Sequence, residues 1–373
     1  MKYFLKTYGC QYNVWDSVRI KYLLDHIGWQ ETSESESEVV FVIACAVRKS
    51  AVDRMLGKIH TWYDKRVVVT GCVLDDDKKK LDKKNVLYWD IKKPEKLKKI
   101  LFEEYSDENF SLNSKSIDIE QLLELGNPKS AYLPIMTGCN NFCTYCAVPF
   151  TRGRETSRPM EEIIDDFKKL VAKGHKEIIL LGQNVNSYNP TVISTSPEPP
   201  AGWTEGEEKS HDKLNNVKPF AMLLNELNNI SGDFLISFTS NHPKDMTDDI
   251  IKAVRDLSKI KKEIHLPLQS GSNKVLRSMN RPYTKEQYLA LIDKIRKNIP
   301  AVKITTDIIV GFPNETKEDF QETIDLFNKV NFTQAYINKY SPRVGTAAEK
   351  LGDPIPWSEK QRRWRILNDM QKN

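Results

Sequence analysis

The sequence predicts an α/β protein in two parts, a small open sheet of parallel strands followed by a partial barrel of six β/α units. First, short apolar, β-branched or aromatic runs alternate with longer amphipathic stretches along most of the chain, which is typical of parallel sheets covered by helices. Second, 373 residues are enough for two sizeable cores. We place a first domain at residues 1–105, a linker at 106–130 and the barrel at 131–373.

Four strand-like runs, each followed by a polar amphipathic stretch, predict the first domain. Ligands of such sheets gather at the carboxyl ends of the strands, and Cys10, Cys45 and Cys72 follow the first three runs there. A single cysteine at a strand end is most simply a buried small residue, whereas three in this arrangement suit an iron–sulfur cluster with one open iron. The runs are Lys2–Tyr8, Val39–Ile43, Val67–Thr70 and Val86–Trp89.

An acidic stretch rich in Ser and Asn, from about Phe102 to Lys129, predicts the linker. Beyond it, six strand-like runs alternate with helix patterns, fewer than the eight units of a full barrel. We therefore expect a partial (β/α)6 barrel with its chemistry at the carboxyl ends of the strands. The runs are Tyr132–Met136, Glu177–Leu181, Phe234–Phe238, Glu263–Leu268, Lys303–Val310 and Gln334–Tyr340.

Three cysteines follow the first barrel strand. Cys139, Cys143 and Cys146 are spaced Cys-x-x-x-Cys-x-x-Cys, and three thiolates so spaced can hold three corners of a [4Fe-4S] cube while the fourth iron stays open to a substrate. A structural zinc site would need a fourth Cys or His, and the nearest histidine downstream is His175. Three buried small side chains are the simpler alternative, but half of the six cysteines of the chain lie in this one loop.

This cysteine loop resembles that of radical S-adenosylmethionine (SAM) enzymes, and further segments resemble the methylthiotransferases of the MiaB type, which modify tRNA. The resemblance covers nearly the whole chain. It implies an N-terminal methylthiotransferase domain followed by a radical SAM barrel. The segments are Thr7–Gln11, Cys45–Arg48, Gly71–Cys72, Arg152–Gly153, Glu155–Arg158, Leu181–Tyr188 and Ser240–Asp245.

The resemblance implies an enzyme that adds a methylthio group to C2 of N6-isopentenyladenosine next to the tRNA anticodon. It implies two [4Fe-4S] clusters, a radical SAM cluster on the cysteine loop and an auxiliary cluster on the three cysteines of the first domain. The implied partners are SAM, tRNA carrying N6-isopentenyladenosine, a low-potential reductant such as flavodoxin or ferredoxin, and a sulfur donor. The target base must leave its stack, which is easiest in a single-stranded loop.

SAM binding requires close approach of the backbone and polar groups that meet a zwitterion. Gly182, Gln183 and Asn184 after the second barrel strand fit this need, although Asn184 could equally cap a helix. Each of the remaining candidates also has a structural alternative. Gln269 and Ser270 are candidates for contacts with ribose or substrate, or else they cap a loop. Gly311 could allow close approach of adenine or relieve a tight turn. Arg281 and Arg343 could bind a carboxylate or phosphate, or simply be exposed.

Composition limits the class of protein. A net charge of +5, with 39% hydrophobic and 29% charged residues, is ordinary for a folded protein and permits an RNA partner without requiring one. The opening MKYFLKTYG lacks a signal-peptide pattern, and no eighteen apolar residues run together. Six cysteines in so long a chain do not suggest the disulfide framework of a secreted protein. We therefore expect a cytoplasmic protein with no membrane association.

Two competing hypotheses remain. Methylthiotransferases that modify threonylcarbamoyladenosine in tRNA or an aspartate of a ribosomal protein share both cysteine sets, and the wording of Gln183–Tyr188 favours the isopentenyladenosine enzymes. From another class, a non-catalytic iron–sulfur or zinc RNA-binding protein would also use such cysteines.

Two features depart from the family pattern. Residues 189–218 form a long stretch without clear periodicity, whose role the sequence does not indicate. The chain also ends soon after the basic segment Arg362–Arg365. Because the family's RNA-binding β-barrel domain would follow at this point, we expect that domain to be absent.

Overall fold

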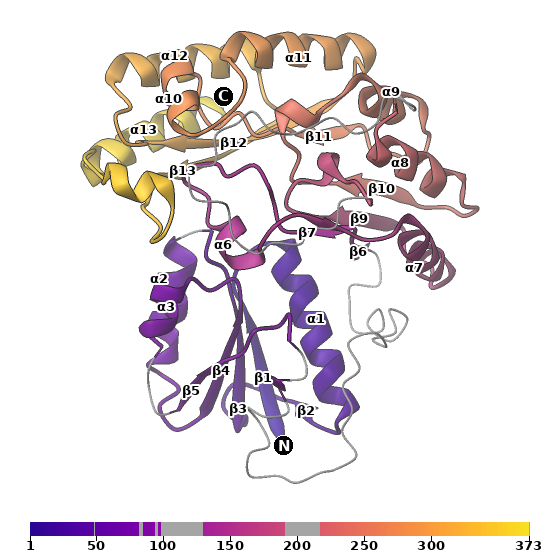
Figure 1. The fold of residues 1–373 in the computed structure, drawn as a ribbon, viewed down its shortest axis with the longest axis vertical. Helices are drawn as coiled ribbons and strands as arrows, with labels where there is room; N and C mark the ends of the chain where they lie inside the picture. The colour runs from indigo at the N-terminus through magenta and orange to yellow at the C-terminus, as the bar shows by residue number, and fades with distance from the viewer. Residues whose placement is uncertain (48, 82–84, 94–95, 98–129, 191–216, 373) are drawn as a thin grey trace. The chain divides into compact units, whose positions relative to one another are not determined.

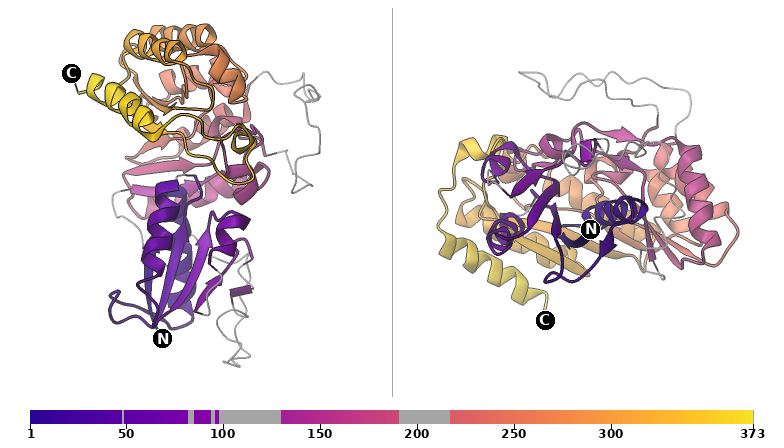
Figure 2. Two further views of the ribbon diagram at one scale, coloured as in Figure 1. Left: turned by 90° about the vertical axis from the view of Figure 1, so that its left-hand side faces the viewer. Right: turned by 90° about the horizontal axis from the view of Figure 1, so that it is seen from below.

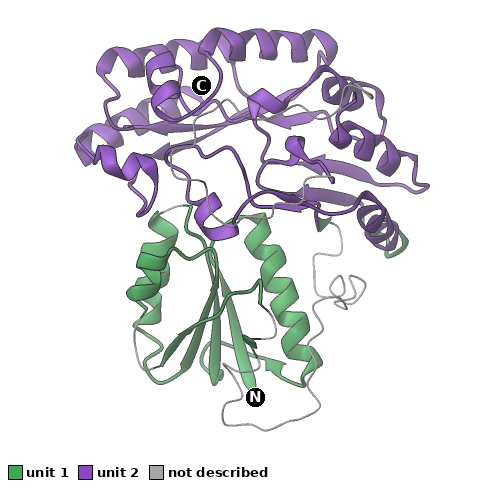
Figure 3. Ribbon diagram, viewed as in Figure 1, with its two compact units in different colours: residues 1–132, 172–175 green, residues 133–171, 176–373 purple. Residues whose placement is uncertain are grey.

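The computed structural model describes residues 1–47, 49–81, 85–93, 96–97, 130–190 and 217–372. They form two compact α/β units, an N-terminal unit of residues 1–132 and 172–175 and a barrel unit of residues 133–171 and 176–373 (Figure 3). Nearly all of the predicted linker 106–130 and of the long stretch 189–218 lies outside the described residues, so the predicted domain boundaries stay a prediction. In the described part, no helix is both long and apolar enough to cross a membrane.

The N-terminal unit is built on five parallel strands in the order β2-β1-β3-β4-β5 (Figure 1). Four of them correspond to the four predicted runs. The fifth, β2, is an addition of two exposed polar residues that no hydrophobic pattern marks. The strands are β1 (Lys2–Thr7), β2 (Gln30–Glu31), β3 (Val39–Ala44), β4 (Arg66–Gly71) and β5 (Val86–Tyr88).

The central strand β3 has both faces covered, and all six of its residues are buried. Its even-numbered residues pack with α2 (Lys49–Ile59) and its odd-numbered residues with α1 (Gln11–His26). Figure 2, in its view from below, shows these two helices on opposite sides of the sheet. This two-sided burial explains the uninterrupted apolar run of the strand. A short helix, α3 (Asp75–Lys79), follows β4.

The barrel unit contains six parallel strands in two sheets, β10-β9-β6 and β11-β12-β13. A bridge between Ile236 and Ile260 joins β10 to the segment that leads into β11. The six predicted runs are therefore confirmed as strands of a partial barrel. The strands are β6 (Ser130–Pro134), β9 (Glu177–Leu181), β10 (Leu235–Phe238), β11 (Glu263–His265), β12 (Lys303–Val310) and β13 (Gln334–Lys339).

Strand β11 ends at His265, three residues before the end of the predicted run. Pro267 explains the difference, because proline has no backbone N–H to donate to β12. The backbone of Leu266 still donates to the Thr305 carbonyl at 2.8 Å. The next donor, Leu268 N, turns instead to the side-chain hydroxyl of Thr306 at 2.8 Å.

Helices cover the outer faces of the two barrel sheets (Figure 1). Two of them, α11 and α12, begin at capping boxes, which fix their first residues. The capping pairs are Thr284 with Gln287 and Thr316 with Asp319. The covering helices include α7 (Met160–Ala172), α8 (Pro219–Asn229), α9 (Asp248–Asp256), α11 (Lys285–Asn298), α12 (Lys317–Val330) and α13 (Trp357–Met370). Two shorter helices are α6 (Val148–Arg152), directly after the cysteine loop, and α10 (Asn273–Ser278).

A buried ion pair fixes α13 to the loop after β12. Arg363 Nη1 lies 2.6 Å from Glu315 Oε2, and the two side chains are 4% and 0% exposed. The Gly311 N–H donates to the same carboxylate oxygen at 2.6 Å. Burial raises the pKa of Glu315, while the Gly311 N–H and the Arg363 guanidinium oppose that shift. The basic segment Arg362–Arg365 is thus partly a core contact of the barrel unit.

Replacing Arg363 with Met should lower the free energy of unfolding by about 3 to 5 kcal/mol, because it leaves the Glu315 carboxylate buried without its cation. Urea unfolding of the protein, followed by circular dichroism, measures this loss. Arg362→Met on the same helix is the control. Its guanidinium is half exposed and pairs with Glu359 at the surface, so its loss should cost less than about 1 kcal/mol. Equal losses in the two variants would contradict the assignment of the buried pair.

Candidate metal centre

The cysteine loop follows the short strand β7 (Met136–Thr137), which pairs antiparallel with β8 (Thr156–Ser157). Gly138 begins the loop with a φ of 78°, and a Cβ there would lie 1.9 Å from the Arg154 carbonyl oxygen. The Gly138 N–H donates to Gln183 Oε1 at 2.6 Å, and the Cys139 N–H donates to the Gly153 carbonyl at 3.2 Å. The loop therefore closes against its own far end, and only glycine fits at position 138.

All three loop cysteines are free thiols. Burial raises the pKa of Cys139 to about 12, and the negative charge of Cys143 adds to the shift. Burial likewise raises the pKa of Cys146, followed by the charges of Cys143 and Cys139. Among the described residues, however, no group of three or more His, Cys, Asp and Glu side chains is close enough to be a preformed metal site. The thiols influence one another's pKa but do not form a preformed coordination set.

Arg281 lies against this loop. Its side chain is buried, and its Nη1 donates to Cys143 Sγ at 3.3 Å. The sequence offered Arg281 as a contact for a carboxylate or phosphate, whereas the structure brings it to a cysteine sulfur. A metal-bound thiolate is the kind of anion that a buried guanidinium can stabilise. The donor set of the loop, three thiols and one cation, therefore fits a [4Fe-4S] cluster with three protein ligands.

The segment after β9 meets the same loop. Gly182 has no room for a side chain, because a Cβ there would lie 2.5 Å from Met136 Cγ. Gln183 accepts the Gly138 N–H, as described above. Asn184 does not cap the following turn. Its Nδ2 donates instead to Asp245 Oδ2 at 2.7 Å.

Among the buried polar atoms of the described barrel unit that make no hydrogen bond, four lie after the ends of β9, β10 and β11. They are Asn184 Oδ1, Asn241 Oδ1, His242 Nε2 and Gln269 Oε1. Buried polar atoms in proteins are nearly always satisfied, so this set is where a polar ligand would complete the hydrogen bonding. The sequence analysis missed Asn241 and His242 as ligand contacts, although both lie in the segment Ser240–Asp245 that carried the resemblance.

His242 is prepared as a hydrogen-bond donor. Its Nδ1 accepts from the Lys244 N–H at 3.2 Å, so the neutral ring carries its proton on the unpartnered Nε2. Burial, with the charges of Arg281 and Lys244, holds the pKa of His242 far below its usual range. His265 differs, because its two ring nitrogens contact Thr305 Oγ1 and Asp307 Oδ2 at 2.9 and 3.1 Å.

The remaining residues predicted to bind ligands at the carboxyl ends of the barrel strands make contacts inside the barrel unit. The Ser270 hydroxyl accepts the Ser272 N–H at 3.2 Å. Gly311 donates to Glu315, and a Cβ on it would lie 2.4 Å from Lys360 Cγ. Arg343 is buried. These contacts match the structural alternatives for Ser270 and Gly311, and the ligand roles of all three residues stay predictions.

The N-terminal unit brings its three cysteines to one sheet edge. Cys10, Cys45 and Cys72 follow β1, β3 and β4, which are neighbours in the sheet. The Cys72 N–H donates to the Ala44 carbonyl at 3.0 Å. A Cβ on Gly9 would lie 2.7 Å from the Cβ of Cys45. Cys10 itself is exposed, and its thiol donates to Asn13 Oδ1 at 3.3 Å.

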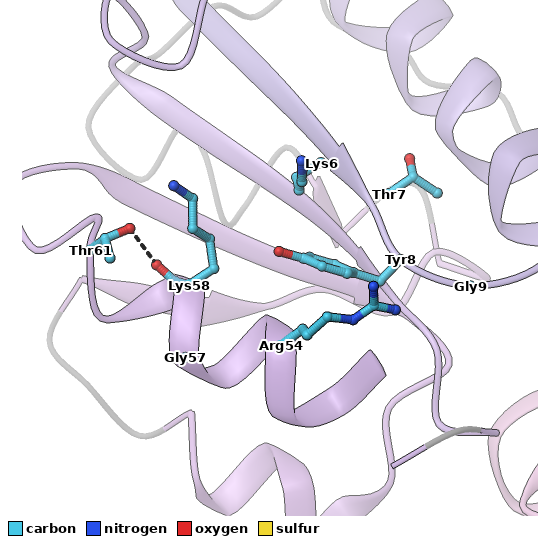
Figure 4. Close-up of a pocket in the computed structure, with 8 residues that line it drawn as sticks. All are labelled: Lys6, Thr7, Tyr8, Gly9, Arg54, Gly57, Lys58 and Thr61. Carbon is cyan, nitrogen blue, oxygen red and sulfur yellow. Dashed lines mark hydrogen bonds between the residues drawn. The ribbon is translucent and has the colours of Figure 1, made fainter. Parts of the chain in front are cut away.

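A pocket of about 710 Å³ opens beside this edge, between the end of β1 and α2 (Figure 4). Lys6, Arg54 and Lys58 supply positive charge to its lining. The Arg54 guanidinium carbon lies 6.0 Å from the ring centre of Tyr8. Lys58 forms an ion pair with Glu34 at 2.6 Å, which leaves Lys6 and Arg54 as the cations best able to meet an anionic group.

Both units of the chain match known protein families. Residues 133–327 match the radical SAM superfamily, and residues 2–89 match an uncharacterized protein family, UPF0004. The tRNA-2-methylthio-N(6)-dimethylallyladenosine synthase of Fusobacterium nucleatum is 41% identical over 98% of this chain and 82% of its own length. The enzyme of the same name from Thermoanaerobacter pseudethanolicus is 40% identical over 99% of this chain and 77% of its own.

Two solved structures are similar to this chain in fold but not in sequence. The cobalamin-dependent radical SAM enzyme OxsB superposes with a TM-score of 0.54 at 11% identity, over 99% of this chain and 56% of OxsB. The radical SAM methyltransferase TsrM of Kitasatospora setae gives 0.54 at 11% identity, over 90% of this chain and 72% of its own. With the cysteine loop, the partial barrel and these relatives taken together, the chain belongs to the radical SAM superfamily and, within it, to the family of tRNA-2-methylthio-N(6)-dimethylallyladenosine synthases.

Proposed function

We propose that this radical SAM methylthiotransferase adds a methylthio group to C2 of N6-isopentenyladenosine in tRNA, next to the anticodon, and that it uses two [4Fe-4S] clusters. The observation that carries the proposal is the identity of about 40% to enzymes of that name over nearly the whole chain. Both cysteine sets support it, because each offers three thiols from neighbouring segments of one unit. Action on threonylcarbamoyladenosine or on a ribosomal-protein aspartate is the alternative within the class.

The radical SAM cluster is proposed to be held by Cys139, Cys143 and Cys146. When bound, the reduced cluster and SAM supply the radical that takes hydrogen from an unactivated carbon. The chain itself contributes a closed loop, whose geometry depends on Gly138 and on the Gln183 side chain. Cys139 is buried, which limits the access of water to that ligand.

SAM itself is proposed to lie over the ends of β9, β10 and β11. The unpartnered acceptors Asn184 Oδ1 and Gln269 Oε1 can take hydrogen bonds from its amino group or ribose hydroxyls. His242 Nε2, a neutral donor, can give one to its carboxylate. Each of these atoms is already held in place by other bonds of the same residue or loop, so the site is preorganised.

Cys10, Cys45 and Cys72 are proposed to hold the auxiliary cluster. Their position at one edge of the N-terminal sheet supports a shared ligand, and the exposure of Cys10 gives a sulfur-containing partner access to it. We further propose a cytoplasmic location, a flavodoxin or ferredoxin as reductant and a separate sulfur donor, because reduced thiols and low-potential electrons require a reducing compartment.

The number of irons tests the two-cluster proposal. Protein reconstituted anaerobically with iron and sulfide should hold about eight irons, by the count of two cubes with three ligands each. Cys45→Ala and Cys143→Ala should each reduce this to about four, because each removes a ligand from one set alone. Metal analysis and the visible spectrum give the result. Stoichiometric zinc, or about four irons unaffected by Cys45→Ala, would contradict it.

The two cysteine sets should differ in what they support. Cys143→Ala should abolish both 5′-deoxyadenosine formation and methylthiolation, because the SAM-binding iron is lost. Cys45→Ala should retain 5′-deoxyadenosine formation and lose the methylthio nucleoside, because the sulfur source is lost. Mass spectrometry of the nucleosides after anaerobic reaction with SAM, dithionite and tRNA carrying N6-isopentenyladenosine measures both products. A Cys45→Ala protein that still makes the methylthio nucleoside at a comparable rate would refute the auxiliary role.

The positive pocket of the N-terminal unit is a candidate contact for an RNA phosphate. Replacing Arg54 with Gln should weaken tRNA binding and make the slope of log affinity against log salt less negative by about 0.9, the value for one lost phosphate contact to a duplex. Fluorescence anisotropy at several salt concentrations measures both. Arg19→Gln, which removes a cation of the same unit outside the pocket, is the control. Equal effects in both variants would show general electrostatics and no role for the pocket.

A further inference from the structure

Arg281 is a buried guanidinium whose three nitrogens are all engaged. Its Nε donates to the Tyr283 hydroxyl at 3.0 Å, its Nη2 to the Pro267 carbonyl at 3.1 Å and its Nη1 to Cys143 Sγ at 3.3 Å. Only 6% of the residue is exposed. One partner is a carbonyl oxygen and another is a phenol whose pKa burial raises, so the cysteine sulfur is the partner that metal binding can turn into an anion.

No carboxylate compensates this cation. In the part of the chain that the structure describes, Arg281 forms no ion pair with an Asp or Glu, in contrast to the buried Arg363, which has Glu315. The titratable groups around Arg281 include two loop cysteines, Cys143 and Cys146. The others are three tyrosines and a histidine whose neutral form is favoured: Tyr145, Tyr283, Tyr288 and His242. A buried charge without a partner costs several kcal/mol. The anion that balances Arg281 must therefore come from the cysteine loop once its thiols are ionised by metal.

The distance between Arg281 and Cys143 is fixed by the turn that follows α10. Thr144 donates through its N–H to the Met279 carbonyl at 3.1 Å and through its hydroxyl to the Ser278 carbonyl at 2.8 Å. Asn280 Nδ2 reaches the carbonyls of Asn141 and Phe142 at 3.4 and 3.3 Å. The turn is thus bonded to both sides of Cys143, so the charge is held beside that sulfur without needing reorganisation.

We propose that Arg281 is the fixed positive charge of the radical SAM cluster, which donates a hydrogen bond to the Cys143 thiolate and raises the reduction potential of the cluster. This inference rests on the proposed cluster site. An oxidised [4Fe-4S] cube with three thiolates has one net negative charge, and adding one electron gives it a second. A positive charge and a hydrogen bond at a ligand sulfur both favour the more negative state, and the buried setting strengthens their effect.

The test is the midpoint potential of the cluster, measured by redox titration followed by electron paramagnetic resonance. The titration uses the Cys45→Ala background, so that only one cluster contributes. Arg281→Gln removes the charge and should lower the ratio of reduced to oxidised cluster at a fixed potential about tenfold or more, which is a shift of about 59 mV to more negative values for one electron. Arg281→Lys keeps the charge but lacks the planar fork that reaches three separate partners, so it should shift the potential in the same direction and by less.

Arg277→Gln is the matched control, since it removes an exposed cation from the same helix, α10. Its potential should equal that of the parent protein. If the Arg281→Gln protein holds no cluster, the midpoint potential of the Arg281→Lys protein tests the inference instead. An unchanged potential in an Arg281 variant that retains four irons would overturn the inference. Failure of the cluster site itself would be seen separately, as a parent protein without iron or a Cys143→Ala protein that still binds its full complement.

Discussion

The first turn of the cysteine loop controls whether the three thiols can meet at all. A side chain at position 138 would collide with the Arg154 carbonyl, so the chain can reverse there only with glycine in the left-handed region. That reversal lets β7 pair with β8 and returns the loop toward the end of β9, where Gln183 holds it. Every later feature of the site, including the approach of Arg281 to Cys143, presupposes this closed loop.

Around the loop, the barrel unit keeps polar atoms that nothing in the described protein satisfies. Leaving a buried donor or acceptor unpaired costs about 1–3 kcal/mol for each group. A ligand that satisfies the four atoms stabilises the folded form through the same contacts.

Much of this architecture could be predicted from the sequence, because its signals are local. The runs Glu177–Leu181 and Lys303–Val310 coincide with β9 and β12, since alternating burial of branched residues marks a strand directly. The observed strands β11 and β2 differ from the predicted ones because of one proline and because a short polar strand has no hydrophobic pattern. Pro267 ends β11 early, and β2 consists of two polar residues at a sheet edge.

The sequence predicted the sulfur atoms of the site and the segment Gly182–Asn184 beside them, but not the other side chains that meet the cysteine loop. Spacing identifies Cys139, Cys143 and Cys146, but nothing near Arg281 in the sequence indicates that its guanidinium turns inward to one of them. The same holds for His242, which reads as an ordinary polar residue until the fold buries its ring and leaves Nε2 without a partner. Such roles arise from contacts between residues far apart in the chain, which local patterns do not encode.

Thr144 donates to the carbonyls of Ser278 and Met279 and accepts the Ala348 N–H, and these three bonds have a consequence for biosynthesis. The Thr144–Ser278 bond spans 134 residues, so at 5–20 residues per second the ribosome needs roughly 7 to 27 s to make the segment that completes this side of the loop. We expect the nascent chain to carry its three loop thiols without these contacts throughout that interval. The timing of iron delivery relative to translation would then determine whether iron binds the cysteine loop before or after these contacts have formed.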